Sequence, residues 1–135
     1  MPGLDTNAGE HMAVELNHTI VNVRDKAASA AFYTEILGLP PHTTYGPFAV
    51  VELDNEVSLD FIDDPEIHQR HYAFLVTEQE FDEIFGRIRE RGLDYWADPF
   101  DRQPGQINTN DGGRGVYWYD PNGHKLEIIT RPYGG

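Results

Sequence analysis

The stretch Val116-Tyr-Trp-Tyr-Asp-Pro-Asn-Gly-His-Lys-Leu-Glu-Ile-Ile-Thr-Arg131 decides the fold of this chain. Asp120-Pro-Asn-Gly123 is typical of a tight turn, and strand-forming residues lie on both sides of it, so the stretch predicts a β-hairpin. Alternation places Leu126 and Ile128 on one face and Glu127 on the other. A carboxylate among apolar neighbours is costly to desolvate unless it is exposed, paired or bound to a metal. The question for the rest of the chain is which of these applies to Glu127.

The composition limits the classes of partner. The chain has 135 residues, which suits one domain, and its 23 acidic and 10 basic residues give a formal net charge of −13. Such a charge repels phosphate backbones and anionic lipids, so we expect no nucleic-acid or membrane partner. No apolar run approaches the roughly 20 residues that cross a bilayer, and the N-terminus does not resemble a signal peptide. The sequence therefore predicts a cytoplasmic protein.

The chain has no cysteine, so any metal must be held by His, Asp or Glu. Residues 1–12 mix Gly, Asp, Asn and Pro without periodicity, which predicts a disordered tail. Residues 13–135 then form a single domain.

The first half of that domain reads as a strand, a helix and further strands. Glu15–Val23 is rich in β-branched residues and predicts a strand. Asp25 is placed to cap an amphipathic helix, and Gly38 is placed to end it. Strand patterns return at 48–53 and at 56–62, with a turn between them.

The second half repeats this pattern. Residues 71–76 predict a strand, and Thr77-Glu-Gln-Glu80 predicts a capping box that opens a helix ending at Gly92. His18 and the residues after it match His71 and the residues after it at a constant offset of 53 positions. This repetition predicts two copies of one βαβββ unit.

The expected fold class is therefore α+β. Two βαβββ modules, at about 13–65 and 66–133, form a curved and partly open mixed sheet around a central cleft. A polar, glycine-rich stretch from 98 to 115 is typical of a loop near a site.

Four side chains occupy matched positions in the two modules. His18 and His71 lie on the first strand of each module, and Asp60 and Glu127 lie on the last. Imidazole and carboxylate groups suit divalent Fe, Mn, Co, Ni or Zn. Each of these residues alone is more often an ordinary strand or surface residue, and the matched position and strand face are what favour a metal site. A metal would also neutralise Glu127.

The two modules, the strand histidines and Asp120-Pro-Asn-Gly-His-Lys-Leu-Glu127 resemble the vicinal oxygen chelate superfamily, which includes glyoxalase I, extradiol dioxygenases, fosfomycin thiol transferases and bleomycin resistance proteins. The resemblance implies that His18, His71 and Glu127 bind a divalent metal. It places Asp60 where glyoxalase I has a fourth ligand, a glutamate. It also makes Tyr117 a pocket tyrosine.

The resemblance implies a metal-dependent enzyme that acts on a small oxygen-bearing substrate, as a glyoxalase-like lyase or isomerase or as a dioxygenase. Glu127 and Tyr117 are the expected catalytic residues, and Tyr117, Tyr119, Trp96 and Phe48 the expected substrate-binding ones. The alternative is a protein that sequesters an antibiotic, as bleomycin resistance proteins do, and a duplicate without a ligand is a third. We also expect a homodimer, since closed two-fold assemblies are the commonest oligomers.

Overall fold

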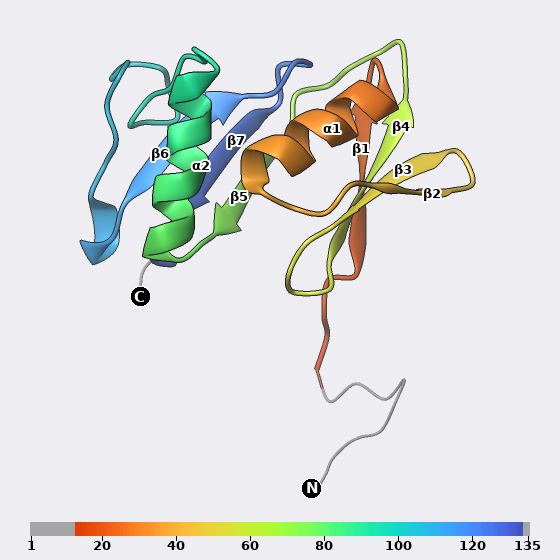
Figure 1. Cartoon of the computed structure of the whole chain (residues 1–135), viewed down its shortest axis with the longest axis horizontal. Helices are drawn as coiled ribbons and strands as arrows, with labels where there is room; N and C mark the ends of the chain where they lie inside the picture. Colours follow the sequence, from red (N-terminus) through yellow and green to blue (C-terminus); the bar gives the residue numbers. More distant parts are fainter. Residues whose placement is uncertain (1–12, 134–135) are drawn as a thin grey trace, which may run out of the picture.

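Two short β-sheets, each covered by one helix, make up the part of the chain that this computed structural model describes, residues 13–133 (Figure 1). The predicted tail at 1–12 lies outside the described residues, so its disorder stays a prediction. The helices are α1 (Lys26–Leu37) and α2 (Glu78–Glu90). The strands are β1 (His18–Val23), β2 (Thr43–Tyr45), β3 (Phe48–Glu52), β4 (Ser58–Asp63), β5 (His71–Leu75), β6 (Gly115–Tyr119) and β7 (Lys125–Ile129).

The two sheets have the same strand order. The first runs β1-β4-β3-β2 and the second runs β5-β7-β6. In each sheet the first strand is parallel to the last strand of its module, while β3 with β4 and β6 with β7 are antiparallel. Trp96 forms a bridge with Tyr117 on the outer side of β6 and so stands where β2 stands in the first sheet. The α+β class and the pair of modules with open sheets are confirmed.

The strand register agrees with the predicted equivalence of the two carboxylates. His18 pairs with Ser58, and His71 pairs with Lys125. Asp60 lies two residues after Ser58, and Glu127 lies two residues after Lys125. The carboxylates therefore occupy the same position in the two sheets.

The helices begin and end where local sequence rules place them. The Asp25 carboxylate accepts a hydrogen bond from the Ala28 N–H (3.1 Å), and Gly38 ends α1 in the left-handed region with φ of 74°. The predicted capping box of α2 is confirmed, because Thr77 and Glu80 exchange side-chain to backbone hydrogen bonds of 2.8 and 3.0 Å.

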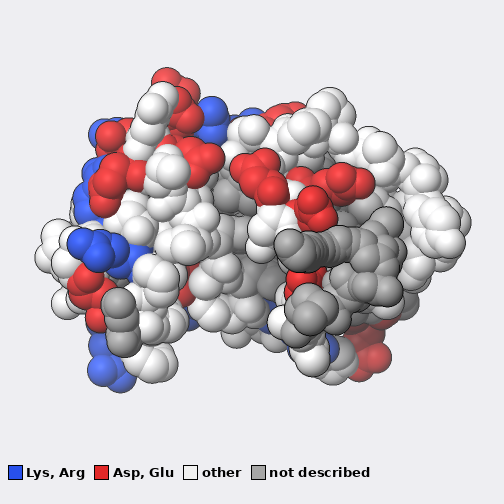
Figure 2. Space-filling view, turned by 90° about the horizontal axis from the view of Figure 1, so that it is seen from below, with Lys and Arg blue, Asp and Glu red and all other residues white. Residues whose placement is uncertain are grey.

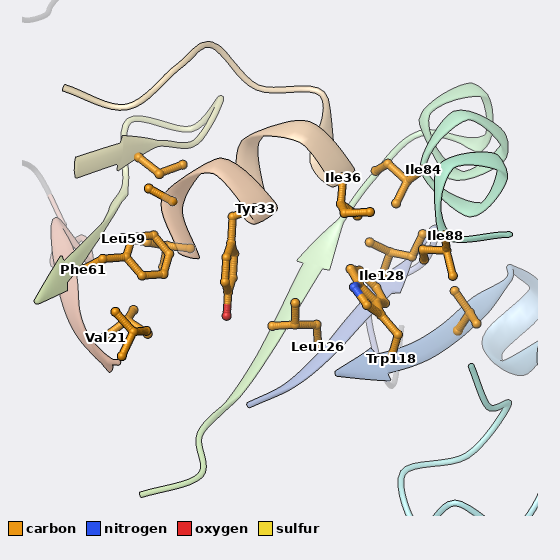
Figure 3. Close-up of a cluster of buried hydrophobic side chains, with 14 of the residues drawn as sticks. Val21, Tyr33, Ile36, Leu59, Phe61, Ile84, Ile88, Trp118, Leu126 and Ile128 are labelled. Atoms are coloured by element: carbon orange, nitrogen blue, oxygen red, sulfur yellow. The ribbon is translucent and has the colours of Figure 1, made fainter. Parts of the chain in front are cut away.

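A continuous apolar core joins the two modules. Helix α1 supplies Tyr33 and Ile36, which lie between the side chains of the first sheet and those of the second module (Figure 3). The Tyr33 ring contacts Phe61 of the first sheet at 4.8 Å between centroids. On the other side, Leu126 and Trp118 of the hairpin are buried below α2. The helix of one module thus fixes the position of the hairpin of the other.

The predicted hairpin turn is also a contact between the modules. The Tyr33 hydroxyl donates a 2.7 Å hydrogen bond to Asp120, whose side chain is only 5% exposed. The same carboxylate accepts from the backbone N–H groups of Asn122 (2.8 Å) and His124 (2.9 Å). Asp120 therefore shapes its own turn and holds that turn against α1.

His124 belongs to this contact and not to a metal site. Its ring is fully buried, with Nδ1 accepting from the Arg70 N–H (3.0 Å) and Nε2 at 2.9 Å from the Asn22 carbonyl. Both ring nitrogens are occupied by backbone groups. His124 therefore joins the turn to β1 and to the segment before β5.

Acidic side chains form several separate groups on the face seen in Figure 2, in line with the net charge of −13. Among residues 13–133, neither helix has the length and apolar character required to span a membrane.

We expect Tyr33→Phe to lower the free energy of unfolding by about 1.5–3 kcal/mol, because a buried carboxylate loses a hydrogen bond. Urea unfolding followed by circular dichroism measures the change. Tyr45→Phe is the control: Tyr45 is 77% exposed, and its substitution should stay within about 0.5 kcal/mol. Equal effects of the two substitutions would contradict the structural role given to Asp120.

Candidate metal centre

The second sheet has one face covered by α2 and one face without a helix. Cross-strand pairing places Glu127 between Ala73 of β5 and Tyr117 of β6, and it places His71 beside Lys125. Paired residues point to the same side of a sheet, so His71, Glu127 and Tyr117 share the helix-free face. The alternation noticed in the sequence therefore gathers polar side chains on one surface.

Glu127 is buried although it lies on this open face. Its side chain is 1% exposed, and His71 Nε2 lies 3.1 Å from its Oε1. The Tyr133 hydroxyl lies 2.9 Å from each of its two oxygens. Neutral hydroxyls and one imidazole surround this carboxylate. A bound cation would offset the cost of burying its negative charge.

His71 is oriented for ligation by its second nitrogen. Nδ1 lies 3.1 Å from the Lys125 carbonyl oxygen, to which an N–H at this position donates. In metal-bound histidines of proteins, the ring nitrogen that does not bind the metal usually donates such a hydrogen bond, which fixes the tautomer and the ring orientation. Nε2 is thereby left facing Glu127, and the two groups fit a divalent cation.

Tyr117 completes this cluster. It is 7% exposed, and its ring stacks near His71 with centroids 6.0 Å apart and planes at 22°. Burial raises the pKa of Tyr117 far above its usual range, and hydrogen bonds with Tyr133 and Glu127 and the Glu127 charge add to this effect. Tyr117 is therefore a neutral phenol that donates a hydrogen bond.

The other two predicted ligands lie on the first sheet. His18 Nδ1 is 2.7 Å from the Asn17 side chain, and Asp60 accepts a 2.7 Å hydrogen bond from the Ser58 hydroxyl. Both line a hollow of about 460 Å³ on the helix-free face of that sheet, together with Phe48. Within residues 13–133 no group of three His, Asp or Glu side chains is close enough to hold a metal. The chain thus brings together His71 and Glu127 and keeps His18 and Asp60 apart from them.

Residues 15–128 match the Glyoxalase/Bleomycin resistance protein/Dioxygenase superfamily. This chain belongs to that superfamily. The resemblance inferred from the hairpin and the strand histidines is confirmed.

Three known proteins illustrate the similarity. The oxidase ChaP-H1 is 67% identical with a TM-score of 0.89, and the match covers 91% of this chain and 100% of that one. The oxidase ChaP-H2 is 63% identical with a TM-score of 0.90, over 92% of this chain and 98% of that one. The glutathione transferase FosA of Serratia marcescens is 29% identical over 124 residues, which are 87% of this chain and 81% of its own length.

The aromatic residues predicted to bind substrate divide between the sheets. Trp96 packs edge-on against Tyr119 with centroids 5.4 Å apart, on the same sheet as Glu127. The Tyr119 hydroxyl donates a hydrogen bond to Asp101 (2.8 Å). Burial, and to a smaller extent the Asp101 carboxylate, raise the pKa of Tyr119 to about 12. Phe48 lies on the first sheet and lines the same hollow as His18. These roles remain predictions for a member of the superfamily.

Sequence reasoning missed Tyr133. It follows the last strand, and no alternation or helical spacing assigns it a direction. Its place next to a site glutamate depends on how the chain turns after β7. That contact depends on tertiary packing.

The stretch from 98 to 115 is held by specific hydrogen bonds. The Asp98 carboxylate accepts from the backbone N–H groups of Phe100 (3.1 Å), Arg102 (2.9 Å) and Gln103 (2.7 Å). Partial burial opposes ionisation, but these donors hold the pKa of Asp98 below its usual range. A second anchor is the reciprocal backbone pair between Asn108 and Gly115. The loop predicted near the site is therefore built around an ionised Asp98.

We expect Asp98→Ala to speed tryptic cleavage after Arg102 several-fold, because three backbone N–H groups lose their common acceptor. Limited proteolysis read by mass spectrometry locates the cut. Asp94→Ala, at an exposed position nearby, should leave the cleavage rate unchanged. A rate at Arg102 that is the same in the wild type and Asp98→Ala would show that the loop is ordered by other contacts.

Proposed function

We propose that this protein is a metal-dependent oxidase that acts on a small oxygen-bearing molecule. The observation that carries the proposal is the buried Glu127 carboxylate 3.1 Å from an oriented His71. The oxidase names of two relatives, each over 60% identical along almost the whole chain, favour oxidation over the isomerase, lyase and sequestration alternatives.

The donor set favours iron. Two histidines and one carboxylate are the ligands of non-haem Fe(II) oxygenases, and this set leaves positions open for other ligands. His18, His71 and Glu127 would hold the ion, which would supply a Lewis acid and the redox chemistry with molecular oxygen as the oxidant. Asp60, on the same face as His18, stays a predicted fourth ligand.

The third ligand is proposed to come from a second copy of the chain. His71 and Glu127 lie on one sheet and His18 lies on the other, so one chain offers two incomplete halves of a site. The first strand of each sheet is an edge strand, and exposed apolar side chains lie on or next to these edges. They are Leu16 (68% exposed), Ile20 (47%) and Leu75 (63%).

A two-fold dimer would cover these edges and bring His18 of each copy to the His71 and Glu127 of the other. An open strand edge is a natural surface for association. Closed two-fold symmetry makes both sites equivalent, because the same surfaces meet twice. The predicted homodimer is therefore part of the proposed site.

The remaining residues of the open face have roles that follow from their chemistry. Tyr117, as a neutral phenol, would donate a hydrogen bond to a substrate oxygen. Trp96 and Tyr119, with Phe48 from the partner copy, would form an apolar wall that excludes water. Such a wall strengthens hydrogen bonds inside the site.

We expect the wild type to bind one Fe(II) per chain and to give an electron paramagnetic resonance signal when nitric oxide, a stand-in for oxygen, is added without air. Glu127→Gln should lose most of the bound iron, because an amide is a far weaker ligand than a carboxylate. Glu90→Gln, at an exposed site on α2, should keep it. A wild-type protein that takes up no divalent metal would refute the proposed oxidase.

A mixing experiment tests the shared site. We expect His18→Ala and Glu127→Gln proteins to bind little metal alone, whereas co-refolded mixtures should recover about a quarter of the wild-type metal content. This fraction follows because half of the dimers are mixed and each mixed dimer has one intact site out of two. A site within one chain would recover nothing, and a monomeric mass by sedimentation would also exclude the shared site.

A further inference from the structure

The C-terminal segment after β7 is fixed by the loop before β6. The Thr130 N–H donates to the Arg114 carbonyl (3.0 Å), and the Arg114 N–H donates to the Thr130 hydroxyl (2.8 Å). Gly113 allows this close approach, since a Cβ there would lie 2.5 Å from the Thr130 hydroxyl oxygen. The chain is therefore held three residues before Tyr133.

From this anchor the Tyr133 side chain points back to the helix-free face of the second sheet. Its hydroxyl lies 2.9 Å from both Glu127 oxygens, while 64% of the residue is exposed. A phenol has one proton to donate, so it serves one oxygen at a time. The contact with Glu127 thus gives this largely exposed residue a buried polar partner.

The two oxygens of Glu127 have different surroundings. His71 Nε2 faces Oε1 at 3.1 Å, so a cation shared by His71 and Glu127 would use Oε1. Oε2 would then be left to the Tyr133 hydroxyl at 2.9 Å. The geometry assigns one oxygen to the metal and the other to the phenol.

We propose that Tyr133 is a positioning residue that keeps Glu127 a one-oxygen ligand by donating a hydrogen bond to Oε2. This inference rests on the proposed metal-dependent function and adds a residue to it. A carboxylate without such a partner is free to turn and offer both oxygens to a cation, which would occupy a position otherwise open to substrate or oxygen. The phenol therefore affects how many positions stay open as well as how tightly the metal is held.

The expected size of the effect comes from other metal sites. Hydrogen-bond partners of metal ligands usually change metal affinity by about 10- to 100-fold when they are removed. Tyr133→Phe removes only the hydroxyl and keeps the ring. Tyr95→Phe is the matched control, because it also deletes only a phenol hydroxyl, at a place where the ring packs on Phe85 of α2 and not on the helix-free face.

Cobalt(II) is a suitable probe, because its visible absorption reports both binding and coordination number. We expect Tyr133→Phe to bind Co(II) about 10- to 100-fold more weakly than the wild type, with weaker visible bands because a two-oxygen carboxylate raises the coordination number. Tyr95→Phe should retain both the affinity and the spectrum of the wild type. Thermal unfolding without metal is measured as well, and Tyr133→Phe should unfold at a lower temperature than the wild type, because the buried Glu127 carboxylate loses a hydrogen bond.

The outcomes separate this inference from the proposed function. If the wild type binds no Co(II), the metal-dependent function fails. If the wild type binds Co(II) and Tyr133→Phe has the same affinity and spectrum, Tyr133 has no positioning role. Tighter binding by Tyr133→Phe would overturn the inference in the opposite sense, because the phenol would then compete with the metal for Glu127.

Discussion

The hydrogen bond from the buried Tyr33 hydroxyl to Asp120 fixes the turn of the final hairpin on α1, next to the apolar core that joins the two halves of the molecule. A carboxylate buried without a cation is costly, and Asp120 is stabilised by one phenol and two backbone N–H groups. Burial raises the pKa of Tyr33 and the Asp120 charge adds to the shift, so the donor keeps its proton. The turn of the final hairpin is thus fixed on α1, and the direction of β7, which carries Glu127, follows from that turn.

The same hairpin carries a second buried carboxylate that is satisfied in a different way. Asp120 receives hydrogen bonds from backbone groups that cannot leave without unfolding the turn. Glu127 instead faces His71 Nε2 and accepts from the Tyr133 hydroxyl, and these side chains are able to rearrange around a cation. One carboxylate therefore stabilises the fold, and the other is the proposed metal ligand.

Much of the fold follows from local rules in the sequence. The caps at Asp25 and Thr77 and the alternation around Glu127 each depend on a few neighbouring residues, so one sequence was enough to predict them. The repeat also predicted that His71 and Glu127 lie near each other, because it gives them matched positions and strand faces, and the structure adds that their strands are neighbours.

What could not be predicted depends on distances between segments. Alternation tells which face a residue occupies but not how far His18 lies from His71, because that distance depends on how two modules pack. The contact between Asp120 and the other module could not be predicted, because Asp is common at this position of a turn whether or not another segment contacts it. Tyr133 follows the last strand, where no periodicity applies.

If two copies share the proposed site, the division of the histidines between two sheets would make metal loading depend on protein concentration. A ligand set shared by two copies ties cation affinity to association, so added metal would draw chains together and dilution would release both the partner and the ion. In a cell, the fraction of loaded protein would then rise more steeply than the amount of protein made. Activity would therefore stay low until the protein concentration is high enough for two chains to associate, and would then rise with the amount of protein.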